Sequence, residues 1–180
     1  MNLSKIENQS KEFLANVEGP PLHLWHPELS GEIDIIIKKN GDWFHEGTVF
    51  KRKSLVKLFA SILRQEDDGE YYLVTPVEKW RIKVEDKPLI IVDVDFTGLS
   101  TENQKITIAT NMEKELEISA DHPLEVTTDS DTGAIEPIVR LDNGLSAKIS
   151  RAAFYRIAEH AVDKGGDFSV LSNGVWFKIG

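Results

Sequence analysis

Residues 54–63 read SLVKLFASIL, and residues 150–162 read SRAAFYRIAEHAV. Both stretches repeat apolar residues at helical spacing behind a serine that can cap a helix. Each therefore predicts an amphipathic helix with one buried face. Each is also preceded by a strand and an Asn-Gly pair, Asn40-Gly41 or Asn143-Gly144, the strongest short signal for a hairpin turn. These two stretches indicate the fold.

The similarity continues beyond the helices. A glycine follows each helix at the same offset, and an aromatic-valine strand comes after it. The spacing from Ser54 to Trp80 then equals the spacing from Ser150 to Trp176. We interpret the chain as α+β, with two modules of similar topology, each an antiparallel sheet covered by one helix. The alternative is that this common order of elements recurs by chance.

The predicted domains are an N-terminal helix within residues 1–20, a first α+β module at 21–85 and a β-rich second α+β module at 86–180. In the N-terminal helix, Ile6, Phe13, Leu14 and Val17 share one face. Strands are expected at 33–37, 43–50, 71–74, 77–84, 89–96, 105–110, 115–119, 124–128, 137–141, 145–149, 168–171 and 175–179. Gly47 is expected as a bulge in the second of these strands.

Composition limits the partners. The 180 residues carry a net charge of −9 and no cysteine. The global field repels polyanions, so we expect neither nucleic acid nor a membrane as a partner. The polar first residues lack the apolar core of a signal peptide, and the most apolar run, 88–92, is too short to cross a bilayer. We expect a cytoplasmic protein, whose oligomeric state the sequence leaves open.

Several short motifs carry a family resemblance. They are residues 21–27 (PLHLWHP), 31–34 (GEID), 41–43 (GDW), 46–48 (EGT), 73–79 (LVTPVEK), 121–124 (DHPL) and 174–177 (GVWF). In combination they resemble bacterial domain-of-unknown-function family 1285 over nearly the whole chain. The resemblance implies an α+β fold with a duplicated core and a second half like a pleckstrin-homology-like barrel. It also implies ligand binding between the halves and a role in sensing or signal transduction. It implies no established reaction, so it assigns no catalytic residues to this chain.

The basic run 51–53 is the first candidate binding element. Arg52 and Lys53 directly precede Ser54, where free N–H groups and the helix dipole favour an anion. Arg52 adds a guanidinium that can hold a carboxylate or phosphate with two hydrogen bonds. The alternative is a solvated basic turn, which is what most charge runs are.

Four further residues are candidate ligand contacts. Glu78 and Lys79 follow Pro76 on a strand that lies at an edge or a bulge, and they face opposite sides. Trp43 could supply an apolar wall, and His122 lies in a turn before Pro123. The alternatives are a structural ion pair for the charged residues and core packing for the tryptophan.

No pattern in the sequence specifies a metal, a cofactor or a catalytic group. His23 and His26 stand three apart but flank Trp25 and precede Pro27, which disfavours a helical metal site. We therefore predict a non-enzymatic protein that binds a small anionic metabolite where the two modules meet, in a regulatory role. The alternatives are a hydrolase-type enzyme that uses His and carboxylate groups, and a protein-interaction domain.

Overall fold

The computed structural model describes residues 3–11, 19–128 and 132–180. The chain divides into two compact units. The N-terminal unit comprises Met1–Pro88 and Asn143–Leu145, and the C-terminal unit comprises Leu89–Asp142 and Ser146–Gly180.

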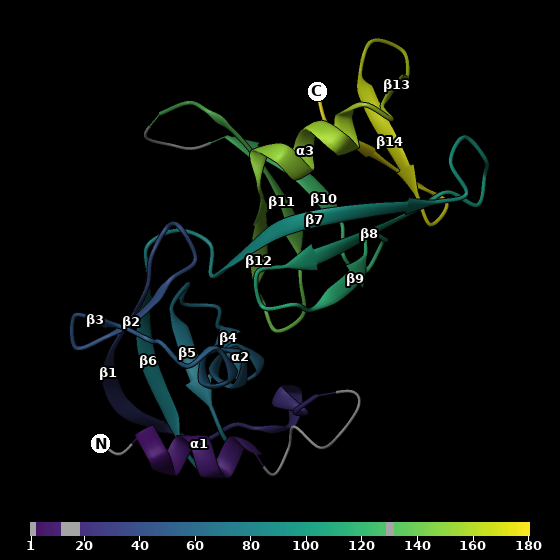
Figure 1. Ribbon diagram of the computed structural model, residues 1–180. Coiled ribbons are helices and arrows are strands. Elements are labelled where there is room, and N and C mark those ends of the chain that lie inside the picture. The colour runs from purple at the N-terminus through teal and green to yellow at the C-terminus, as the bar shows by residue number, and fades with distance from the viewer. Residues whose placement is uncertain (1–2, 12–18, 129–131) are drawn as a thin grey trace. The chain divides into compact units, whose positions relative to one another are not determined.

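The N-terminal unit is built on a six-stranded sheet, shown in Figure 1. Its helices are α1 (Leu3–Lys11), the short 3-10 helix η1 (Leu22–Leu24) and α2 (Lys53–Ser61). Its strands are β1 (Leu29–Ile37), β2 (Trp43–His45), β3 (Thr48–Val49), β4 (Leu63–Gln65), β5 (Tyr71–Val74) and β6 (Lys79–Val84). The strand order is β3-β2-β1-β6-β5-β4.

Every second side chain of β1 from Ile33 onward points into the core of this unit. Ile33, Ile35 and Ile37 are all buried, as expected for successive residues on one face of a strand. Phe59 of α2 is also fully buried, together with Ile62 at the end of that helix. The predicted helix and its buried face are thus confirmed.

Two local predictions in this unit are wrong. Ser54 does not cap α2, because the helix begins at Lys53 and Arg52 is its cap, without a side-chain hydrogen bond. The strand expected at 43–50 is broken at Glu46 and Gly47, whose φ angles are 48° and 74°. Two consecutive positive φ angles are typical of a tight hairpin turn. Gly47 therefore belongs to the turn between β2 and β3 and is not a bulge.

The N-terminal helix is partly described. In α1, Ile6 is only 1% exposed, so the apolar face predicted from the sequence is buried at this position. Phe13, Leu14 and Val17, which were expected on the same face, lie outside the described residues.

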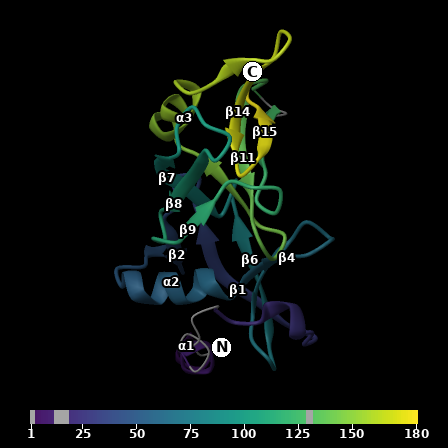
Figure 2. The ribbon, with the colours of Figure 1, turned by 90° about the vertical axis from the view of Figure 1, so that its right-hand side faces the viewer.

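The C-terminal unit contains two sheets and one helix. Its strands are β7 (Leu89–Thr97), β8 (Lys105–Thr110), β9 (Glu115–Glu117), β10 (Leu124–Thr128), β11 (Ile135–Arg140), β12 (Ser146–Ile149), β13 (Val162–Asp163), β14 (Phe168–Ser172) and β15 (Val175–Lys178), and its helix is α3 (Arg151–Ala158). One sheet has the order β10-β11-β12-β7-β8-β9, and the other has the order β13-β14-β15. Figure 2 shows β14 and β15 side by side, as their antiparallel pairing requires.

One apolar core joins these elements. It combines Ile91 and Val94 of β7, Ile157 of α3, and Val170 and Phe177 of the small sheet. Ser150 caps α3 as predicted, since its side chain accepts a hydrogen bond from the Ala153 N–H. The helix was expected to extend to Val162. It ends at Ala158, and Val162 is instead the first residue of β13.

The two modules are similar, and the α+β prediction is confirmed. In each, one helix is followed by a three-stranded meander, β4-β5-β6 or β13-β14-β15. The predicted antiparallel sheets are in fact mixed, because β1 pairs with β6 and β12 pairs with β7 in parallel. The modules also differ. The first meander is joined to its main sheet through β6, whereas the second forms a sheet of its own.

No helix within the described ranges has both the length and the apolar character needed to span a membrane.

Candidate functional site: a pocket in the C-terminal unit

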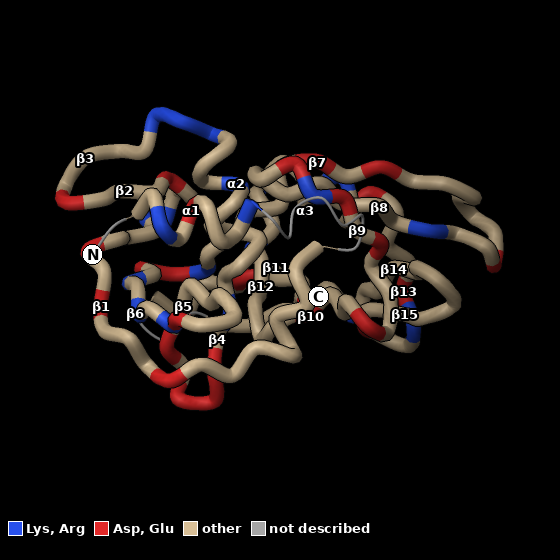
Figure 3. Tube along the Cα trace, turned by 90° about the horizontal axis from the view of Figure 1, so that it is seen from below, with Lys and Arg blue, Asp and Glu red and all other residues tan. Residues whose placement is uncertain are grey.

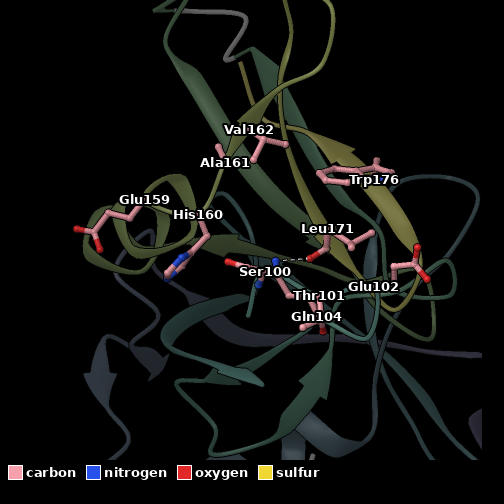
Figure 4. Close-up of a pocket in the computed structure, with 10 residues that line it drawn as sticks. All are labelled: Ser100, Thr101, Glu102, Gln104, Glu159, His160, Ala161, Val162, Leu171 and Trp176. Atoms are coloured by element: carbon pink, nitrogen blue, oxygen red, sulfur yellow. Dashed lines mark hydrogen bonds between the residues drawn. The ribbon is translucent and has the colours of Figure 1, made fainter. Parts of the chain in front are cut away.

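The candidate site is a pocket with a volume of about 520 Å³, lined by three separate segments of the C-terminal unit. The first segment is the β7–β8 turn, the second is the end of α3 with the start of β13, and the third is the β14–β15 hairpin. Figure 4 shows the lining residues, which are Ser100, Thr101, Glu102, Gln104, Glu159, His160, Ala161, Val162, Leu171 and Trp176. The volume lies in the range of pockets that hold small ligands.

Gln104 fixes two of these segments to each other. Its side chain is buried, with 6% of the residue exposed. Its Nε2 donates to the carbonyl of Leu171 at 2.8 Å, and its Oε1 accepts from the Ser100 N–H at 3.1 Å. Its own carbonyl accepts from the Asn173 N–H at 3.0 Å. Hydrogen bonds of Gln104 therefore hold the turn and the hairpin to each other.

The β7–β8 turn adopts a demanding backbone conformation. Ser100 has a φ of 61°, in the left-handed region that few residues other than glycine adopt. Gly98 has the same φ, and a Cβ atom at that position would lie 2.7 Å from the carbonyl oxygen of Asn103. Backbone strain of this kind often occurs at binding sites. The shape of the β7–β8 turn is thus set by its backbone conformation as well as by Gln104.

Trp176 forms an aromatic wall. It is 43% exposed, and the Lys164 ammonium lies 3.8 Å from the centroid of its ring. The matching tryptophan of the first module, Trp80, is instead half-buried, with its ring packed on Gly31. The repeated tryptophan therefore packs on a strand in one module and lines a pocket in the other.

The charged residues of the pocket are acidic. Figure 4 shows Glu102 and Glu159 at opposite ends of it. Neither carboxylate forms an ion pair with any residue that the structure describes, and no described lining residue is Lys or Arg. His160 lies between them in the lining, and its ring centroid is 4.4 Å from that of Phe96. Both carboxylates point away from the centre of the pocket in Figure 4, and the Lys164 ammonium lies over the Trp176 ring, so the apolar, aromatic wall has charges of both signs at its edge.

Arg52 and Glu78, both predicted as ligand contacts, are engaged by the N-terminal helix. Figure 3 shows the basic run that contains Arg52 and Lys53 between β3 and α2. Arg52 donates to Glu7 of α1 at 2.5 Å, and Glu78 accepts from Lys5 of α1. Hydrogen bonds from Lys11 and then from Arg52 hold the pKa of Glu7 below its ordinary value.

The other predicted residues of the N-terminal unit have different surroundings. Lys53 is exposed at the first position of α2. Trp43 is 2% exposed, and its buried indole N–H has no hydrogen-bond partner among the described residues. Lys79 donates to Glu66 at 2.8 Å, and its ammonium lies 4.8 Å from the centroid of the Tyr72 ring.

The carboxylate of Glu66 is shared by two cations. It also accepts from Arg64, at 2.5 Å. Burial alone would raise the pKa of Glu66, but the hydrogen bonds from Lys79 and Arg64 more than offset this, and the pKa is lowered. Lys79 is thus a member of a structural ion network.

His122 belongs to the C-terminal unit, whereas the other five predicted residues belong to the N-terminal unit. Its Nε2 lies 3.3 Å from Oδ1 of Asp142. Within the N-terminal unit, Arg52, Glu78 and Lys79 have different acidic or basic partners, so the structure does not gather them around one point.

The described residues contain no group of three or more His, Asp or Glu side chains placed to hold a metal ion. His23 and His26, considered from their spacing, are both exposed.

Sequence reasoning did not find the pocket, because most of its residues lie in turns. Ser100, Thr101 and Gln104 have the composition of an ordinary loop, and only the fold buries Gln104. One signal was present. The sequence repeat identified Trp176 as the counterpart of Trp80. In the structure Trp176 lines the pocket and is 43% exposed.

The fold and the pocket define a two-unit α+β protein with a preformed cavity in its second unit. Family models match both parts of the chain. Residues 20–87 match "Domain of unknown function (DUF1285), N-terminal domain", and residues 88–179 match "Protein of unknown function (DUF1285), C-terminal domain". The chain belongs to the DUF1285 family, as the resemblance in its sequence predicted.

Two solved structures are similar to it. A DUF1285 family protein from Silicibacter pomeroyi DSS-3 is 35% identical, with a TM-score of 0.85 over 97% of this chain and 93% of that one. A DUF1285 family protein from Shewanella baltica OS155 is 32% identical, with a TM-score of 0.55 over 71% of this chain and 92% of that one. No curated protein matches the chain.

Proposed function

We propose that this protein binds a small ligand in the pocket of its C-terminal unit, in a regulatory rather than a catalytic role. The observation that carries the proposal is the buried Gln104, which ties the β7–β8 turn to the β14–β15 hairpin and so keeps the cavity preformed. A preformed cavity spares a ligand the cost of ordering loops when it binds.

The lining supports binding more than catalysis. His160 has no hydrogen bond to a hydroxyl or carboxylate group among the described residues, so it lacks the partner that activates a nucleophile. The pair of His122 and Asp142 lies elsewhere and is not part of the lining. A hydrolase would need these groups to converge on one substrate.

The test is a screen of small-molecule fragments by two-dimensional NMR on the full chain. Ligands of the pocket should shift the amide signals of Ser100, Gln104 and Leu171 together. Trp176→Ala should weaken binding of these fragments about tenfold, because it removes the aromatic wall. Tyr155→Ala is the control, since Tyr155 is also a substantially exposed aromatic residue, at 52% against 43% for Trp176, and does not line the pocket. A screen without shifts at the lining residues would contradict the proposal.

An anionic ligand at Arg52 is a second candidate, and Glu7 is the observation that favours it. A carboxylate already contacts the Arg52 guanidinium at the start of α2. A ligand carboxylate or phosphate could take its place, with Lys53 adjacent. Glu7→Gln should then increase the affinity for inorganic phosphate, and Arg52→Ala should abolish that increase. Equal phosphate binding by Glu7→Gln and the natural sequence would contradict this candidate.

The sequence also predicted a ligand where the two modules meet. That location stays a prediction, and the proposal for the C-terminal unit uses residues of that unit alone.

A further inference from the structure

We infer that the surface beneath α1 is a binding site for an amphipathic helix of a partner protein, and that α1 is the chain's own, displaceable occupant of it. This surface belongs to the N-terminal unit and is independent of the pocket in the C-terminal unit. Figure 2 shows α1 next to α2, with which it packs. It precedes residue 20, where the match to the N-terminal family model begins, so it lies outside the matched domain.

Ile6 is the centre of the contact between α1 and the rest of the unit, and it is only 1% exposed. Successive residues of an α-helix lie about 100° apart around its axis, so Lys5 and Glu7 lie on the two sides of Ile6. Lys5 donates to Glu78, and Glu7 accepts from Arg52 at 2.5 Å. The surface thus offers an apolar seat with an acidic group on one side and a basic group on the other.

These two charges also fix the direction of the seated helix. A helix that kept its apolar residue in place but ran the other way would bring its cation to Arg52 and its carboxylate to Glu78. Both contacts would then be repulsive, and repulsion of this kind rejects wrong partners. The surface therefore selects an aliphatic residue that follows a basic residue and precedes an acidic one.

Two polar residues make α1 a weak occupant. Ser10, one turn after Ile6 on the same face, is 2% exposed, and its hydroxyl donates to the Ile6 carbonyl of the same helix at 2.7 Å. Gln9 has a buried Oε1 without a hydrogen-bond partner among the described residues. A buried polar atom left unpaired disfavours the docked state. A helix with apolar groups at these two positions would fit the same seat better.

The length of α1 points the same way. It has nine residues, and isolated helices shorter than about 12 residues are marginal in water. Its helical form therefore depends on docking, which rests on one large buried side chain, Ile6, and on ion pairs at the edges. Such an element can leave its seat while the sheet of the unit stays folded.

The occupant that can replace α1 is a helix of another protein and not α1 of a second copy. Attachment to the same chain gives α1 a high effective concentration at its seat. A second copy of α1 makes the same contacts without that advantage, so it does not compete. A partner helix must add contacts, and the position of Ser10 is where an apolar side chain adds them. The expected partner thus carries a basic, an aliphatic and an acidic residue in succession, with an apolar residue four positions after the aliphatic one.

The experiment titrates a synthetic peptide with the sequence of residues 1–18 into the isotope-labelled full chain, and the amide shifts of the N-terminal unit give Kd. Ile6→Glu in the chain should release its own α1 and free the seat. We expect the peptide to bind this variant at least about tenfold more tightly than the natural chain, in which α1 competes. Equal binding to the two chains would overturn the inference.

Changes in the peptide test how well the seat is filled. A peptide with Gln9→Met and Ser10→Ala should bind the Ile6→Glu chain about three- to tenfold more tightly than the natural peptide, because it removes both buried polar groups. Asn8→Ala in the peptide is the control for helix propensity, since Asn8 is exposed on α1. A gain from Asn8→Ala as large as that from the double change would contradict the seat.

An exchange of charges tests the direction of the helix. A peptide with K5E and E7K should bind the Ile6→Glu chain about tenfold more weakly than the natural peptide, since both ion pairs become repulsive. It should regain its affinity when the chain also carries Arg52→Glu and Glu78→Lys. If the exchanged chain does not restore binding, these two residues do not select the helix and the inference is overturned.

Hydrogen exchange of the natural chain gives a readout that needs no variant. The Gln9 and Ser10 amides should exchange at least about a hundredfold faster, relative to their intrinsic rates, than the Ile35 and Leu73 amides in the sheet. Equal protection of the four amides would show that α1 leaves only when the whole unit unfolds, and so would loss of the sheet signals in Ile6→Glu. Either result overturns the inference, as would a dimer of the natural chain that exchanges α1.

Discussion

The side-chain amide of Gln104 and the main-chain carbonyl of Leu171 are joined by a 2.8 Å hydrogen bond that crosses from the β7–β8 turn to β14. Gln104 itself is buried, and the same side chain also accepts from the Ser100 N–H. One residue therefore satisfies main-chain groups on two segments and sets the distance between them.

Removal of the Gln104 side chain should destabilise the C-terminal unit. Gln104→Ala leaves the Leu171 carbonyl and the Ser100 N–H without partners, which costs about 2 kcal/mol. The free energy of unfolding from urea titration measures this loss. Gln65→Ala is the control, because the Gln65 side chain makes a single exposed hydrogen bond to the Gly69 carbonyl, and its loss should cost less than about 0.5 kcal/mol. Equal losses in the two variants would contradict a bridging role for Gln104.

The backbone at Ser100 should be more stable with glycine than with alanine. Ser100 has a φ of 61°, and a side chain in that region costs about 1 kcal/mol relative to glycine. Both substitutions remove the hydroxyl group, so their difference isolates the backbone effect. We expect Ser100→Gly to unfold at a higher urea concentration than Ser100→Ala. The reverse order would show that the turn does not hold this conformation in solution.

Trp43 should tolerate phenylalanine and not alanine. Its ring is buried, but its indole N–H has no hydrogen-bond partner among the described residues. Trp43→Phe keeps most of the packing and removes an unsatisfied donor, so we expect a loss below about 1 kcal/mol. Trp43→Ala leaves a cavity and should cost about 3 to 5 kcal/mol. Thermal unfolding of the two variants compares them, and a large loss in Trp43→Phe would indicate a partner for the N–H.

Docking of α1 should weaken in acid. The pKa of Glu7 is held below its ordinary value by Lys11 and Arg52. A group whose folded-state pKa is lowered stabilises the folded contact above its unfolded pKa, and that contribution disappears as the pH falls through the folded-state value. Hydrogen exchange of the Ile6 amide should therefore become faster, relative to its intrinsic rate, below about pH 4. Glu7→Gln provides the comparison, since its exchange should lack this step; a step of the same size in that variant would contradict the role of Glu7.

The sequence predicted the elements better than their pairing. The helices at Lys53–Ser61 and Arg151–Ala158 follow from apolar spacing, which is a local property. The parallel pairs β1–β6 and β7–β12 join strands that are distant in the chain, and no local pattern encodes them. The same limit explains the separate sheet of β13, β14 and β15, which has the same element order as its counterpart in the first module.

The candidate site was harder to predict for a related reason. The basic run drew attention to Arg52 because local charge is visible in a sequence, whereas its partner Glu7 lies on another element. Gln104 looked like a loop residue because burial of a turn depends on what packs over it. The repeat pointed to Trp176 as a matched position. It could not predict that Trp176 is exposed, because Trp80 at the matching position packs on Gly31.

The small sheet has a further consequence for the stability of the pocket wall. The hydrogen bonds that tie β14 and β15 to the rest of the C-terminal unit concentrate at residues 171–173, where Ser172 and Asn173 both donate to the Ile118 carbonyl. The strands themselves bond only to one another as a sheet. The sheet is also held by its apolar side chains, because Val170, Phe177 and Ile179 belong to the core of the unit. Opening of this sheet would expose that core, so the pocket wall formed by β14 and β15 should be as stable as the C-terminal unit itself.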